Sequence, residues 1–141
     1  MNHAIFWILS GSMLASAAEP QWILHRGPDA KRCSIGQGSL TLEAGLTKIV
    51  PTGTDLTLTV PLGAADAFAA AEYPFFAVRY RYKTTLAIAG LFFTTDTLTG
   101  LSDKSYSPFP VSGDGAWHDA VVDMRTFKHQ KWVGKVTSFR F

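Results

Sequence analysis

Apolar and polar residues alternate over several short stretches of the chain, the pattern of β-strands that bury one face. The alternation is clearest at residues 39–43 and 56–60, and strands are predicted there and at residues 22–25, 75–83, 88–95, 106–111, 117–124 and 136–141. Turn-forming runs such as Gly27-Pro28-Asp29 and Ser112-Gly113-Asp114-Gly115 separate them. The alanine-rich residues 63–71 favour one short helical segment. Many short strands with so little helix predict an all-β fold, an antiparallel β-sandwich.

The strand predicted at residues 75–83 has the most distinct faces. Because side chains alternate along a strand, Phe76, Val78, Tyr80 and Tyr82 share one face, and Phe75, Ala77, Arg79, Arg81 and Lys83 share the other. We expect the first face to join the core and the second to be basic and partly open. Along residues 117–124 the inward positions are predicted to be Ala120, Val122 and Met124. Pro108 and Pro110 predict an edge or bulged strand at 106–111, because proline cannot donate to a neighbouring strand.

Residues 1–18 resemble an export leader. A short apolar segment, Ala4-Ile5-Phe6-Trp7-Ile8-Leu9, is followed by small residues that end in Ala15-Ser16-Ala17-Ala18. The apolar segment is shorter than the roughly 20 residues that span a bilayer. No lysine or arginine precedes it, so an N-terminal anchor or a core helix stays open as an alternative. We expect cleavage of residues 1–18 and a secreted domain, extracellular or periplasmic, over residues 19–141, with no membrane contact afterwards.

Composition narrows the classes of partner. Residues 19–141 are enough for one domain and too few for two. The net charge of +2, with 17% charged residues, is too balanced to predict nucleic acid as a partner. Cys33 is the single cysteine, so no disulfide can form within the chain. It either packs as a small apolar residue or pairs with another chain.

The motifs of catalysis and metal binding are missing from the sequence. It has no G-x-S-x-G, P-loop or H-E-x-x-H pattern and no paired cysteines for zinc. Cys33 with His25, His118 or His129 has no local signature of a nucleophile and base. We therefore expect no enzyme, no catalytic residue, no cofactor and no metal ligand set; a calcium ion held by loop carboxylates such as Asp96 and Asp103 lacks support.

Several short motifs, in order along the chain, resemble galactose-binding-like jelly rolls, the carbohydrate-binding-type domains of secreted bacterial proteins. They are Tyr73-Pro74-Phe75-Phe76 with the strand that follows, Gly90-Leu91-Phe92-Phe93, Asp114-Gly115-Ala116-Trp117-His118, Trp132-Val133-Gly134 and Phe139-Arg140-Phe141. The resemblance implies a jelly-roll sandwich that binds a glycan without chemistry of its own. In such domains a last strand with an acidic residue follows the segment like Phe139-Arg140-Phe141, and a structural calcium lies near the chain ends. The sequence given stops before that strand, which implies a fragment or an open sheet edge, and loss of the calcium.

The candidate ligand-binding residues combine aromatic rings with charged groups. Sugars stack on aromatic rings while polar side chains hold their hydroxyls. The predicted set is Arg79, Arg81, Lys83, Phe93, Tyr106, Asp119 and Asp123, with Phe93 and Tyr106 expected to be exposed. The alternative for the charged residues is cross-strand ion pairs, with Asp119 and Asp123 facing Arg79 and Arg81. Trp117 and Trp132 are expected in the core.

Two functions follow as hypotheses. The first is a secreted, non-catalytic carbohydrate-binding-like domain whose partner is a glycan or polysaccharide. The second is an extracellular structural or assembly protein that completes its sandwich through subunit contacts. Self-association would then use an open sheet edge or Cys33.

Overall fold

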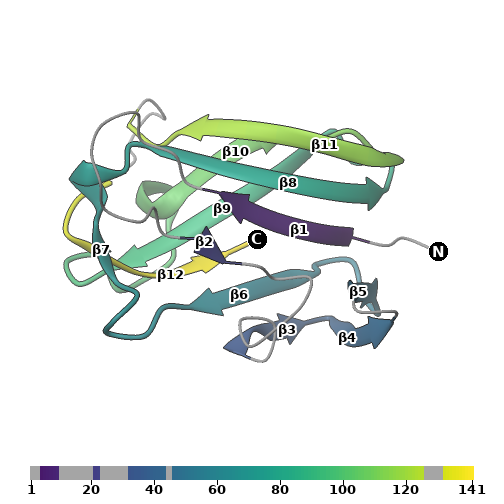
Figure 1. The fold of residues 1–141 in the computed structure, drawn as a ribbon, viewed down its shortest axis with the longest axis horizontal. Coiled ribbons are helices and arrows are strands. Elements are labelled where there is room, and N and C mark those ends of the chain that lie inside the picture. Colours follow the sequence, from purple (N-terminus) through teal and green to yellow (C-terminus); the bar gives the residue numbers. More distant parts are fainter. Residues whose placement is uncertain (1–3, 10–20, 23–31, 44–45, 126–131) are drawn as a thin grey trace.

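A computed structural model describes residues 4–9, 21–22, 32–43, 46–125 and 132–141 (Figure 1). The turn predicted at Gly27-Pro28-Asp29, most of the strand predicted at 22–25, and His25 and His129 lie outside the described residues. No helix in the described part of the chain is both long and apolar enough to cross a bilayer.

The described residues form β-strands and two short 3₁₀ helices. The strands are β1 (Ala4–Leu9), β2 (Gln21–Trp22), β3 (Ser34–Gly36), β4 (Gly38–Glu43), β5 (Leu46–Pro51), β6 (Thr57–Pro61), β7 (Phe68–Ala69), β8 (Phe75–Lys83), β9 (Ile88–Thr95), β10 (Tyr106–Pro110), β11 (Asp114–Asp123) and β12 (Lys135–Arg140). The 3₁₀ helices are η1 (Ala70–Glu72) and η2 (Asp103–Ser105). The helical segment predicted at 63–71 is wrong for most of its length, because the chain there forms a turn, then strand β7, and enters η1 only at Ala70.

The strands form two antiparallel sheets that pack face to face (Figure 1). Sheet A has the order β11-β8-β1-β5-β4, with β2 also paired to β1. Sheet B has the order β10-β9-β12-β6-β3, with β7 also paired to β12. The prediction of an all-β protein with packed antiparallel sheets is confirmed. So is the edge position predicted for the proline-containing strand β10.

The core lies between the two sheets and is built by alternate residues of strands such as β6, β8 and β9. Its buried apolar residues are Ile49, Leu58, Val60, Ala70, Phe76, Val78, Tyr80, Leu91, Phe93, Phe109, Val122, Met124, Trp132, Val136 and Phe139. The inward face predicted for 75–83 is therefore confirmed for Phe76, Val78 and Tyr80, whereas Tyr82 is half-buried. Trp132 is a core residue, as expected, and its indole N–H donates to the carbonyl of Tyr73 at 3.0 Å.

The strand β1 occupies an interior position of sheet A. Its residues pair with β8 in six consecutive antiparallel positions, from Ala4 opposite Tyr82 to Leu9 opposite Ala77. On its other side β1 pairs with β5 at one position, Ala4 opposite Ile49. β1 lies inside the segment predicted as a leader, and the structure describes the chain with that segment attached. Cleavage after Ala18 stays a prediction.

Candidate functional site

The outer surface of sheet A carries the basic strand face predicted from the sequence. β8 and β11 pair along most of their lengths, and opposed residues of an antiparallel pair project to the same side of the sheet. We call this surface the Trp117 face; its residues are Phe75, Arg79, Arg81 and Lys83 on β8 and Trp117, Asp119, Val121 and Asp123 on β11. It brings together all of the predicted site residues except Phe93 and Tyr106.

Trp117 is an exposed ring near one end of this face. Its side chain is 37% exposed, and it lies opposite Arg81. The guanidinium carbons of Arg81 and Arg79 lie 5.5 and 5.9 Å from its ring centroid, within the range of a cation–π contact. The prediction that Trp117 fills the core is wrong, because its register places it on the outer side of the sheet with Asp119.

A hydrogen-bonded turn sets the position of Trp117. The register of β11 on β8 shifts between Asp114 and Trp117, and Gly115 there has a φ of 85°. The Asp114 carboxylate accepts a hydrogen bond from the backbone N–H of Ala116 at 2.7 Å, and it lies 2.8 Å from His118 Nε2. The hydrogen bond with His118, followed by that from Ala116, lowers the pKa of Asp114. The indole is thus flanked on both sides by residues fixed to one carboxylate.

Of the two arginines beside Trp117, Arg79 has a carboxylate partner among the described residues and Arg81 has none. Arg79 Nε lies 3.8 Å from Asp119 Oδ1, and both side chains are at least half exposed, so this ion pair contributes little to stability. Arg81 forms no ion pair with any carboxylate among the described residues, and its identified neighbour is the Trp117 ring. The predicted cross-strand pairing therefore holds for Arg79 and leaves the charge of Arg81 available to a ligand.

The far end of the same face is closed by an internal ion pair. Arg125 donates through Nε and Nη2 to the two oxygens of Asp123, at 2.9 and 2.8 Å. These contacts lower the pKa of Asp123 to about 2. The guanidinium of Arg125 also lies 5.0 Å from the centre of the Phe75 ring. Asp123 is therefore held by Arg125, away from Arg79 and Arg81, with which the sequence grouped it.

Two predicted site residues lie elsewhere in the fold. Phe93 is fully buried, so the expectation that it is exposed is wrong: on β9 the side chains of Leu91, Phe93 and Thr95 point into the core. Tyr106 is half-buried on β10 of sheet B, with its ring 4.7 Å from that of Phe92. Neither residue belongs to the Trp117 face.

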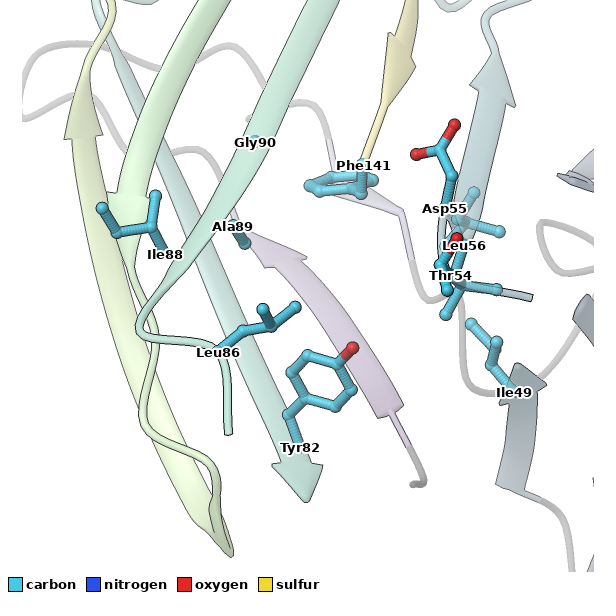
Figure 2. A pocket seen from close by; sticks show the side chains of 11 residues that line it. Ile49, Thr54, Asp55, Leu56, Tyr82, Leu86, Ile88, Ala89, Gly90 and Phe141 are labelled. Carbon is cyan, nitrogen blue, oxygen red and sulfur yellow. The ribbon is translucent and has the colours of Figure 1, made fainter. Parts of the chain in front are cut away.

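A cavity of about 190 Å³ opens between the sheets at the end where β8 leads into β9 (Figure 2). Tyr82 and Leu86 lie on one side of it, Ile49 and Leu56 on the other, and Phe141 at a third. Asp55 is the charged residue in the lining of the cavity. The cavity is smaller than the 300–1,000 Å³ of ordinary small-molecule sites, and its few polar groups suit a sugar poorly.

The described residues include no group of three or more His, Cys, Asp or Glu side chains that would hold a metal ion. Asp96, one of the loop carboxylates considered for calcium, accepts a hydrogen bond from the backbone N–H of Lys135 at 2.8 Å. Cys33 is half-buried and packs against the core. His118 forms a hydrogen bond with Asp114, which lies just before Trp117 in the chain.

The fold thus defines a class, an all-β domain of two packed antiparallel sheets. Comparison of the chain with protein-family models, with curated proteins and with solved structures finds no match.

Proposed function

We propose that this chain is a secreted, non-catalytic carbohydrate-binding-like domain that holds a glycan on the Trp117 face. The observation that carries the proposal is the exposed Trp117 ring, set beside Arg79 and Arg81 on an open sheet surface. The resemblance of several motifs to galactose-binding-like jelly rolls supports the same class. In this proposal residues 1–18 direct export and are removed.

The chemistry of the face suits a sugar. The apolar C–H face of a pyranose ring packs on an indole, and a ring held by its neighbours loses little entropy on binding. Arg81 presents several N–H donors in a fixed plane, which suits vicinal hydroxyls or the carboxylate of a uronic acid. Asp119 adds acceptors for hydroxyl groups next to Arg79. Together these groups provide a stacking surface with polar contacts along one side.

The test is titration calorimetry of the exported protein against neutral and uronate-containing polysaccharides. Trp117→Ala is expected to weaken binding about 30-fold or more, because a central tryptophan of a binding site typically contributes at least about 2 kcal/mol. Val121→Ala is the matched control: Val121 is 69% exposed on the same strand and face but lies opposite Ala77, away from the arginines.

Binding that is lost with Trp117→Ala and kept with Val121→Ala supports the proposal. A folded protein that binds none of the polysaccharides contradicts it. Binding that survives Trp117→Ala contradicts the location, and the outer face of sheet B around Tyr106 and Phe92 then becomes the surface to test.

A further inference from the structure

Among the described strands, β1 alone joins two parts of sheet A. In the order β11-β8-β1-β5-β4, removing β1 leaves the ribbons β11-β8 and β5-β4 without a shared neighbour. Two-stranded ribbons are marginally stable by themselves. The β1 position, by which we mean the gap between β8 and β5, must therefore hold a strand if sheet A is to be continuous.

The walls of the β1 position are apolar and buried. Val78 and Tyr80 of β8 are 2% and 3% exposed, and Ile49 of β5 is 2% exposed. Their register partners in β1 are Ile8, Phe6 and Ala4. Loss of the strand would open this part of the core to water and leave one side of the β8 backbone without hydrogen-bond partners.

Among the described residues, β1 pairs with β8 at six positions and with β5 at one. Ile49 and Tyr82, both opposite Ala4, line the 190 Å³ cavity, so that cavity adjoins the end of the β1 position (Figure 2).

The strand that fills the β1 position is the apolar segment of the predicted leader. If the leader is removed, the processed protein lacks the strand that sheet A requires. We propose that the β1 position is a strand-binding site, which in the processed protein takes an extended apolar segment of another polypeptide chain. That segment runs antiparallel to β8 and places apolar residues opposite Val78 and Tyr80. Strand addition of this kind gains its affinity from main-chain hydrogen bonds and its specificity from alternate side chains.

The inference uses the leader removal proposed above, but its test does not depend on export. The full chain is folded with a protease recognition sequence inserted after Ala18, and it is cut only then. The probe is a fluorescent synthetic peptide with the sequence of residues 2–12. The control peptide carries Phe6→Pro and Trp7→Pro; because successive N–H groups of a strand point to opposite sides, one of the two prolines removes a donor to β8.

We expect the probe to bind the cut protein saturably, measured by fluorescence polarisation, at least tenfold more tightly than the control peptide, and not to bind the uncut protein. Copurification of the cut leader fragment with the rest of the chain is support for a non-covalent strand site, and a brief urea pulse then allows the probe to exchange into it. If the cut chain unfolds once the fragment leaves, the probe should restore its circular dichroism and the control peptide should not.

The proposal is overturned if the chain loses the fragment, keeps its fold and binds neither peptide, since the position would then close by itself. It is equally overturned if both peptides bind alike, or if neither restores an unfolded chain. Glycan binding is measured separately on the uncut chain, in which β1 stays beside Arg79 and Arg81, so its presence or absence is decided whatever the peptides do.

Discussion

Phe93 is one of the largest fully buried side chains of the core. Its ring meets that of Trp132 edge to face, with the centroids 4.9 Å apart. Phe93→Ala is expected to lower the free energy of unfolding by about 3–5 kcal/mol, because it removes buried apolar surface and leaves a cavity. Urea unfolding followed by circular dichroism measures this. Phe92→Ala, on the outer side of the same strand, should cost clearly less, and equal losses would contradict the assignment of faces.

Asp123 provides a prediction of pH dependence at the same scale. Its pKa of about 2 lies below the usual value near 3.9 for an unfolded chain, so the native state binds the proton more weakly. The stability that the Asp123–Arg125 pair contributes is therefore present above about pH 4 and is lost as the pH falls toward 2. Carboxyl titration by NMR should place the midpoint near 2, and Arg125→Gln should return it toward 4. A midpoint that does not move in this variant would contradict the ion pair as the cause.

The strands that carry Asp123 and Phe93 show what alternation along a strand can and cannot predict. Asp119 and Asp123 were predicted to share a face, and Trp117 has the same parity, so alternation alone could have placed its ring outside. At Phe92-Phe93 the sequence is ambiguous, because either ring could face the core and the polar Thr95 shares the buried parity of Phe93. Only packing against Trp132 decides between them.

Among the elements, the turn that begins β12 requires glycine at position 134. Gly134 has a φ of 81°, and a Cβ atom there would overlap Asp96 Oδ1, which accepts a hydrogen bond from the N–H of Lys135. Gly134→Ala is expected to lower the free energy of unfolding by about 1–3 kcal/mol through strain at this backbone conformation. Gly100→Ala is the control, because a Cβ there meets nothing within 4 Å. Thermal or urea unfolding compares the two, and equal stability would contradict the strain.

The strands whose bounds the sequence predicted best are two of the longest. The bounds predicted for Phe75–Lys83 and Ile88–Thr95 agree with β8 and β9. β3 and β5 were missed because β3 has only three residues and β5, Leu46–Pro51, does not alternate cleanly. β1 was interpreted as part of a leader because its apolar run is followed by the small residues Ala15-Ser16-Ala17-Ala18, and only its pairing with β8 reveals it as a strand.

For the whole molecule, the order of the strands predicts the order of hydrogen exchange. β8, β9 and β12 lie inside their sheets and pair on both sides, whereas β10 and β11 lie at edges. Amides of the interior strands should exchange only through larger openings, so they should be protected longest. Exchange of the full chain followed by mass spectrometry measures this. Edge strands as protected as β8 would contradict the strand order.

The candidate site, taken across the molecule, could be predicted only in part. Pairing of β8 with β11 follows from no local pattern, yet it is this pairing that joins Arg79 to Asp119 and Arg81 to Trp117. The separation of Tyr106 from these residues has the same origin, because Tyr106 is on sheet B. The residue types in the sequence suggested sugar binding, and the pairing of the strands determines which of those residues lie next to one another.

The prolines of β10 have a further consequence for the behaviour of concentrated solutions. Pro108 and Pro110 offer no N–H at that edge of sheet B, and the bulge between Asp114 and Trp117 distorts the β11 edge of sheet A. Among the described strands, sheet A is thus protected at its β11 edge and sheet B at its β10 edge. Contact between molecules through these two edges should therefore be disfavoured, and fibres that require them should not form even when the protein is crowded.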